Sequence, residues 1–279
     1  MIELILYGGL GNQLFEYAFA RSKQLESNDK LLLINTYLFH NYQFDDSLKE
    51  FNLPQNVVFI KKPRRLIRIV SESRRFIGDL GVYKLLSPLG IYIWRVNKYK
   101  NIECKKQNNY IYGYFQTEKF FYKYSKEIKT ELKLKSVYHN SEFYEKITHS
   151  NSVCIHVRRG DYCKLNMVIC DLVYFKKAIE IMKAKLNAPT FFLFSDDMDW
   201  AKSNLNIVEG INFVDEKAKD YEQLSLMSNC KHFIISNSTF SWWAQYLSEN
   251  TNKLVIAPAM WMPYDKEKRD IYQKNWLLI

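Results

Sequence analysis

The stretch that decides this fold is Ser152-Val153-Cys154-Ile155-His156-Val157-Arg158-Arg159-Gly160-Asp161-Tyr162. Its first residues are apolar and mostly β-branched, which predicts a buried strand over 152–155, and Gly160 then breaks the pattern. Both arginines therefore lie beyond the end of a strand, where open α/β sheets bind ligands. Adjacent arginines on an extended chain point to opposite sides. One can bind a phosphate while the other pairs within the protein, the alternative being two ordinary surface arginines near a turn.

The second half of the chain alternates between predicted strands and helices. Strands are predicted over 190–194, 211–214, 232–235 and 254–257, and helices over 171–186, through 200, over 221–227 and over 242–247. Repeated βα units predict a parallel sheet with helices on both faces.

Three of these strand ends carry polar clusters, namely 156–162, 195–197 and 236–241, and all should open on one edge of the sheet. Hydroxyl groups and backbone N–H groups at a helix start suit an anion such as phosphate. The alternative for the last cluster is plain N-capping by Ser238 or Thr239.

The first half also begins as a βαβ unit. A strand over 2–7 runs into Gly8-Gly9-Leu10-Gly11-Asn12-Gln13 and a helix over 12–27, followed by strands over 31–34, 57–60 and 110–116. A glycine turn before a helix is a ready anion site, or else a tight turn with glycines for geometry alone. Two such halves, divided between residues 150 and 151, predict a cleft between two domains.

Composition and charge narrow the class of protein. The 279 residues are 47% hydrophobic and 16% aromatic, which predicts a packed core and argues against disorder. We find no secretory signal and no apolar run long enough to span a membrane. Five cysteines without a CxxC pair indicate a reducing, cytoplasmic setting, and the histidines show no zinc-site spacing.

The net charge of +10 is concentrated in one segment. Residues 61–100 hold eleven Lys or Arg and two acids, a net of +9. This local patch argues against a nucleic-acid partner. Its arginines alternate with apolar residues, as in basic amphipathic helices that lie on an anionic membrane, although a solvated helical face is the alternative.

One short acidic motif suggests a metal, but we discount it. Asp197-Met198-Asp199 resembles the DxD motif that binds Mn²⁺ or Mg²⁺ in some sugar transferases. We expect Asp199 to lie in the first turn of a helix, where acidic residues are favoured anyway.

A set of motifs runs in order through the chain. They are Gly8 to Phe15, Gly113-Tyr114-Phe115-Gln116, His156 to Tyr162, Phe194 to Asp197, Leu226 to His232, Asn237 to Trp243, and Ile256-Ala257-Pro258 followed by Trp261. This order resembles that of glycosyltransferase family 11, the α-1,2-fucosyltransferases. The resemblance covers nearly the whole chain and is weakest over 61–100.

The resemblance implies an α/β fold of the GT-B type, with two Rossmann-like domains facing across a cleft. Residues 1–150 would form the acceptor-side domain and residues 151–279 the domain that binds GDP-fucose. The implied reaction is inverting transfer of L-fucose from GDP-β-L-fucose to O2 of a terminal β-galactoside, without a metal or other cofactor. The implied setting is cytoplasmic O-antigen or capsule assembly, with segment 61–100 resting on the inner membrane.

The resemblance also implies roles for individual residues. Arg158 would meet the charge that builds on the departing β-phosphate, with Asp161 as the second catalytic residue. Donor binding would involve Gly9, Asn12, His156, Arg158, Arg159, Asp196, Ser238, Thr239 and Phe240. Asn12 would reach the donor from the other domain, whereas Arg159 and Asp161 would also shape their loop by pairing.

Two roles stay open. Either Asp161 or Glu118 could be the general base. The family often carries Asp where this chain has Gln223, next to Glu222, so the residue that reads guanine is unassigned. Because of Gln223, we retain a second hypothesis: the enzyme transfers another GDP-sugar, or transfers to a non-galactose acceptor. The third hypothesis is a glycan- or nucleotide-binding protein without turnover.

Overall fold

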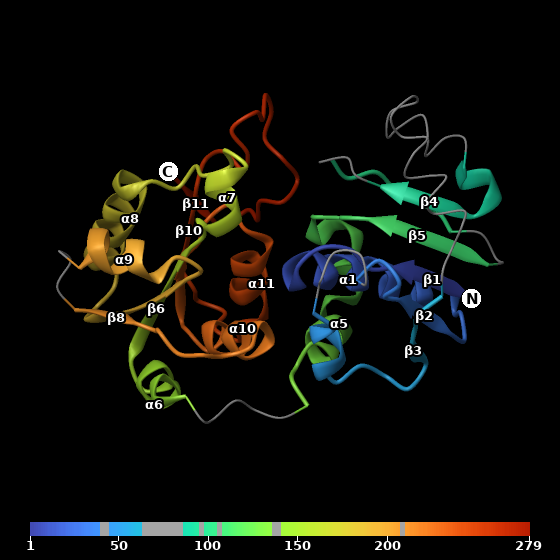
Figure 1. Cartoon of the computed structure of the whole chain (residues 1–279), viewed down its shortest axis with the longest axis horizontal. Helices are drawn as coiled ribbons and strands as arrows, with labels where there is room; N and C mark the ends of the chain where they lie inside the picture. The colour runs from blue at the N-terminus through green and yellow to red at the C-terminus, as the bar shows by residue number, and fades with distance from the viewer. Residues whose placement is uncertain (40–44, 63–85, 95–97, 105–107, 136–140, 207–209) are drawn as a thin grey trace. The chain divides into compact units, whose positions relative to one another are not determined.

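The structure is a computed structural model that describes residues 1–39, 45–62, 86–94, 98–104, 108–135, 141–206 and 210–279 (Figure 1). The chain separates into two compact units, Met1–Lys135 and Ser136–Ile279. Most of the basic segment 61–100, on which the prediction of membrane contact rests, lies outside the described residues. Among the described residues, no helix combines the length and the apolar character needed to cross a bilayer.

The first unit is built on a parallel sheet with the strand order β3-β2-β1-β5-β4. Its strands are β1 (Ile2–Ile5), β2 (Leu32–Asn35), β3 (Val57–Ile60), β4 (Ile91–Trp94) and β5 (Asn109–Gly113). Its helices are α1 (Leu10–Ser27) and α5 (Ser125–Glu131), with single 3-10 turns at Ser47–Glu50, Ser87–Leu89, Glu118–Phe120 and Tyr122–Tyr124. The sequence predicted all of these strands except β4, which lies within segment 61–100 and follows a Pro- and Gly-containing stretch.

Helix α1 is buried on nearly all sides, although it carries several polar residues. Phe19 stacks on Phe115 with ring centroids 3.9 Å apart. Arg21, the polar interruption of its apolar face, forms an ion pair of 2.8 Å with Glu131 of α5. A buried charge is tolerated when it is paired in this way, so this face packs despite Arg21.

The second unit is built on a parallel sheet with the order β11-β10-β9-β6-β7-β8. Its strands are β6 (Asn151–Val157), β7 (Pro189–Ser195), β8 (Ile211–Phe213), β9 (His232–Ile234), β10 (Val255–Ala257) and β11 (Leu277–Leu278). Its helices are α6 (Glu142–Thr148), α7 (Gly160–Lys164), α8 (Leu172–Lys185), α9 (Met198–Leu205), α10 (Asp220–Ser228) and α11 (Thr239–Leu247). Strand β11 follows the strand that the sequence predicted to be the last.

Helices cover both faces of this second sheet, as the alternating pattern predicted. Helices α8 and α9 lie on one face and α10 and α11 on the other (Figure 1). Phe175, Ile179 and Met182 of α8 are fully buried against Val153 and Ile155 of β6. Helix α6 packs on β6 and falls in this unit, so the units divide at Lys135 rather than between residues 150 and 151.

Both sheets reverse their strand order at their first strand. Strand β1 lies between β2 and β5, and β6 lies between β7 and β9. Helices that connect strands on opposite sides of such a point leave a crevice beyond the carboxyl ends of the two central strands, where ligands bind. The glycine turn 8–13 follows β1 and the His156–Tyr162 stretch follows β6, so both motifs lie at these switch points.

Candidate functional site

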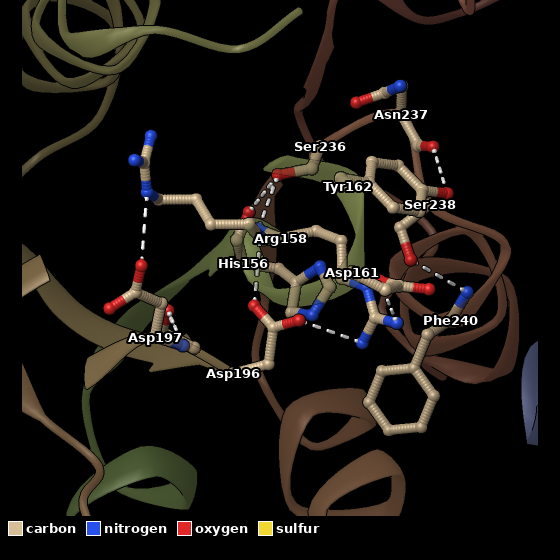
Figure 2. A network of polar contacts seen from close by, with 12 residues as sticks. His156, Arg158, Asp161, Tyr162, Asp196, Asp197, Ser236, Asn237, Ser238 and Phe240 are labelled. Atoms are coloured by element: carbon tan, nitrogen blue, oxygen red, sulfur yellow. Dashed lines mark hydrogen bonds and ion pairs between the residues drawn. The ribbon is translucent and has the colours of Figure 1, made fainter. Parts of the chain in front are cut away.

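Arg158 lies directly after β6 and is held between two carboxylates. Its Nη2 lies 2.7 Å from Oδ1 of Asp161, and its Nη1 lies 3.0 Å from Oδ2 of Asp196 (Figure 2). The guanidinium also lies over the ring of Tyr162, 5.4 Å from its centroid. The side chain keeps 34% of its exposure, so this cation is oriented by the protein and still accessible.

Asp196 directly follows β7 and bonds to Arg158 and Arg159, which directly follow β6. Its Oδ2 pairs with Arg158, while its Oδ1 accepts a hydrogen bond of 2.8 Å from the backbone N–H of Arg159. A Cβ on Gly160 would come within 2.6 Å of that Oδ2. Gly160 is therefore needed for the close approach of Asp196, a role that the sequence analysis missed because no local signal reveals a neighbour 36 residues away.

Arg159 pairs within the protein, as expected for one of the two adjacent arginines. Its guanidinium lies 4.0 Å from the ring centroid of Trp200, and its Nε lies 3.3 Å from Oδ2 of Asp197. Asp197 also caps α9, since its Oδ1 accepts from the backbone N–H of Trp200. Asp199 lies in the first turn of α9, as predicted, and the contact between Arg159 and the donor stays a prediction.

His156, the last residue but one of β6, is a neutral imidazole. Only 5% of it is exposed, and burial together with the positive charge of Arg158 lowers its pKa to about 3. Its ring centroid lies 5.7 Å from that of Phe240. Within the described residues its Nδ1 has no hydrogen-bond partner, so a buried polar atom beside Arg158 remains to be satisfied.

The loop between β9 and α11 is bonded to the end of β6, the strand that precedes Arg158. Ser236 donates to the carbonyl of His156 at 2.6 Å and accepts from the backbone N–H of Arg158 at 3.2 Å. Ser238 is the N-cap of α11, with its Oγ accepting from the N–H of Phe240. Thr239 is the first residue of that helix, half-buried like Phe240. The capping alternative thus holds for Ser238, and donor contacts from all three stay predictions.

Asn237 and Tyr162 are two residues of this network that the sequence analysis did not assign. The Nδ2 of Asn237 donates to the carbonyls of Met167 and Trp261, both at 3.0 Å. Tyr162 donates to the carbonyl of Asn237 at 3.1 Å, and burial raises the pKa of its phenol to about 12. Figure 2 shows Tyr162 close to Arg158 and His156, and Asn237 bonded to Tyr162 on its other side. Their motif membership was visible, but their contacts required the fold.

In the first unit, the glycine turn places Gly9 and Asn12 at the start of α1. Gly9 is exposed and is the N-cap residue, with its carbonyl accepting from the N–H groups of Asn12 and Gln13. The Oδ1 of Asn12 accepts a hydrogen bond of 2.9 Å from Nε2 of Gln116.

The two positions left open by the sequence lie on helical elements. Glu118 begins the 3-10 turn Glu118–Phe120. Burial lowers the pKa of Lys129, and the negative charge of Glu118 partly offsets this effect. Gln223 lies on α10, and its Nε2 donates weakly to the carbonyl of Ala218 at 3.5 Å. In the part of the chain that the structure describes, no three His, Cys, Asp or Glu side chains cluster as metal ligands would.

Comparison with known proteins identifies the family of this chain. Residues 82–279 match the model of "Glycosyl transferase family 11". An α-1,2-colitosyltransferase of Escherichia coli is 28% identical over 98% of this chain and 97% of its own length. Human galactoside α-(1,2)-fucosyltransferase 1 is 33% identical over 34% of this chain and 28% of its own length.

Among solved structures, the α-1,6-fucosyltransferase NodZ, in a crystal soaked with GDP-fucose, is similar in fold. It matches with a TM-score of 0.58 and 16% identity, over 88% of this chain and 91% of the other. The two parallel sheets and this likeness identify the fold as GT-B, with two Rossmann-like units. Its family model and its motifs together make this chain a member of glycosyltransferase family 11.

Proposed function

We propose that this glycosyltransferase moves L-fucose from GDP-β-L-fucose to O2 of a terminal β-galactoside, with inversion and without a metal. The observation that carries the proposal is Arg158, an accessible cation fixed at the switch point of a parallel sheet. The names of the relatives support the class of reaction, since they include α-1,2-fucosyl and α-1,2-colitosyl transferases.

The proposed transfer reaction needs a positive group of this kind near the leaving phosphate. The bond from the anomeric carbon to the phosphate oxygen breaks as the acceptor oxygen attacks the opposite face, and negative charge collects on GDP. A preorganised positive group next to that charge stabilises the transition state more than the ground state. Arg158 would supply it, and His156, the buried neutral imidazole beside it, would help to hold the nucleotide.

The acceptor hydroxyl must also lose a proton. Asp161 and Glu118 are the two candidate bases, and Asp161 is the one that lies in the Arg158 cluster. Both carboxylate oxygens of Asp197 have partners within the protein, because Oδ1 caps α9 and Oδ2 pairs with Arg159. This supports a reaction that does not use Asp197 as a metal ligand. The contact of Asn12 with the donor sugar belongs to the same proposal.

A second candidate is a different donor sugar. The colitosyltransferase matches nearly the full length of this chain, and Gln223 stands where the family often carries Asp. Equal turnover of a colitosyl donor and GDP-fucose would favour this candidate.

The experiment is GDP release from GDP-fucose, with EDTA present and lactose as acceptor. We expect release that depends on lactose and falls on the order of a hundredfold or more in Arg158→Ala, as when one charge-stabilising donor is removed. Lys164→Ala, on exposed α7, is the matched control and should keep wild-type rates. Tight GDP-fucose binding without release for any acceptor would favour a binding protein, and absence of both would refute the donor.

Contact of segment 61–100 with the inner membrane remains part of the proposed setting, with the enzyme in the cytoplasm near a lipid-linked acceptor of O-antigen or capsule assembly. An E. coli relative named an O-antigen biosynthesis glycosyltransferase supports this setting. Sedimentation with anionic vesicles at low salt tests it, and failure to bind would remove the membrane from the proposal.

A further inference from the structure

The switch point of the first sheet holds a side-chain pair that no assigned role explains. The turns that follow β1 and β5 meet there, and Gln116 donates from Nε2 to Oδ1 of Asn12 over 2.9 Å. An amide has one accepting and one donating end. Because Gln116 donates to the accepting end, this bond stabilises the orientation of the Asn12 amide in which Nδ2 faces away from residue 116.

The donating end of Asn12 lies over the glycine turn. A Cβ on Gly8 would come within 2.8 Å of Nδ2 of Asn12, and Gly8 has a φ of +88° that favours glycine. The backbone N–H of Asn12 is bonded to the carbonyl of Gly9 at 2.9 Å. Nδ2 therefore lies next to the backbone of the β1–α1 turn, at the edge where the fold binds ligands.

The backbone that carries Gln116 is held firmly. Gly113 has a φ of +147°, and a Cβ there would lie 1.8 Å from the carbonyl oxygen of Trp94, so only glycine allows β4 and β5 to come this close. Phe115 adopts a φ of +46° and is kept there by its stacking on Phe19 of α1. Strain of this kind, costing on the order of 1–3 kcal/mol, persists only where the surroundings impose it.

We propose that Gln116 is a positioning residue that keeps the Asn12 amide turned so that Nδ2 donates to a substrate oxygen. This inference rests on the proposed function, in which Asn12 contacts the donor sugar. Gln116 itself does not touch the substrate. Its role is to prevent the amide from turning over and presenting an oxygen to an anionic donor.

The test uses Gln116→Glu, which keeps the shape but changes the hydrogen bond. An ionised glutamate only accepts, so Asn12 would turn its NH₂ group toward residue 116. We expect kcat for transfer at pH 8 to fall on the order of a hundredfold, the size seen when one transition-state donor is lost. As the pH falls toward 5, a growing fraction of the glutamate, whose ordinary pKa is about 4.3, is protonated and donates again. The ratio of Gln116→Glu to wild-type kcat should therefore rise.

Three comparisons make the result decisive. Gln55→Glu, an exposed glutamine of the same unit, should match the wild type at every pH. Gln116→Leu should lose activity at all pH values, and Asn12→Ala should show no further loss on adding Gln116→Glu, since both remove one interaction. A Gln116→Glu enzyme that is fully active at pH 8, or whose loss does not change with pH, would overturn the inference.

The wild-type enzyme separates this outcome from failure of the proposed function. If it turns over no GDP-fucose with any acceptor, the proposed function fails. If it transfers fucose and Gln116→Glu behaves like Gln55→Glu, only the role of Gln116 fails.

Discussion

Arg158 depends on neighbours that are distant in the sequence. Asp196 bonds its Nη1 and also the backbone of Arg159, so one carboxylate fixes both the cation and the strand end that carries it. Asp161 is 55% exposed and holds the other side of the guanidinium. Both oxygens of Asp196 have partners within the protein, so we assign it the role of positioning Arg158. Its contact with the donor stays a prediction.

Gly160→Ala should displace Asp196 without touching the substrate. The added methyl group would lie 2.6 Å from Oδ2 of Asp196, so the carboxylate must move away from Arg158. We expect kcat/KM to fall on the order of a hundredfold, since misplacement by about 1 Å costs that much. Asp196→Ala should act through the same contact, so the double variant should be no worse than the more damaging single variant. Additive losses in steady-state assays would contradict this coupling.

His156 should make the protein sensitive to acid. Its pKa is about 3 in the folded protein and about 6.5 in an unfolded chain, so the unfolded state binds more protons between these values. The unfolded state therefore gains protons that the folded state does not, and the free energy of unfolding falls as the pH drops from 6.5 toward 3.

Urea unfolding at pH 7.5 and pH 4.5 measures this effect. We expect His156→Phe to lose less stability on acidification than the wild type does, while His149→Phe, exposed on the surface, should leave the wild-type difference unchanged. Equal acid sensitivity of His156→Phe and the wild type would show that His156 is not held neutral.

At the scale of elements, the site is formed where loops after β6, β9 and β10 are bonded together. Asn237, 1% exposed, bonds the carbonyls of Met167 and Trp261 and accepts from Tyr162. The three bonds tie two segments, the one after β6 and the one after β10, to the start of α11. Without its bond, the carbonyl of Trp261 would lack this donor in the protein interior, which is costly.

Asn237→Leu should therefore destabilise the protein. The carbonyl of Trp261 would lose its donor in a buried bond, at a cost of about 1–3 kcal/mol, and that of Met167 in a partly buried one, at a smaller cost. We therefore expect the free energy of unfolding to fall by roughly 1–4 kcal/mol. Asn252→Ala, at an exposed asparagine of the same unit, should change it by less than about 0.5 kcal/mol. Urea titration followed by tryptophan fluorescence measures both variants, and equal effects would argue against the bonds from Asn237.

At the scale of the whole molecule, two parallel sheets each supply a switch point, and family 11 chemistry needs both a nucleotide site and an acceptor. We expect GDP to stabilise the protein through the second unit, by about 2.7 kcal/mol at a hundredfold excess over Kd.

Thermal unfolding with and without GDP measures this stabilisation as a shift in Tm. Arg158→Ala should lose most of the shift and Gln55→Glu should keep it. A full shift in Arg158→Ala would remove Arg158 from the nucleotide site.

The pattern of alternating strands and helices was sufficient to predict the α/β class and most elements of both sheets. Strands such as β3 and helix α8, with Asp171 as its cap, are local features, because periodicity and capping act over a few residues. Strand β4 was missed because it lies within segment 61–100, whose pattern favoured basic amphipathic helices, and β11 was missed because it has only two residues. Helix α7 was missed because it begins at a glycine that reads as a break.

By itself the sequence determined the fold class, the family and the identity of the residues in the motifs, since these follow from local pattern and residue type. Only the tertiary structure decided the partners: Asp196 and Gly160 around Arg158, Asn237 across three loops, and Gln116 on Asn12. The reason is physical. A hydrogen bond or steric contact between residues 36 or 104 positions apart depends on which strands lie side by side, and strand order is a property of the whole sheet.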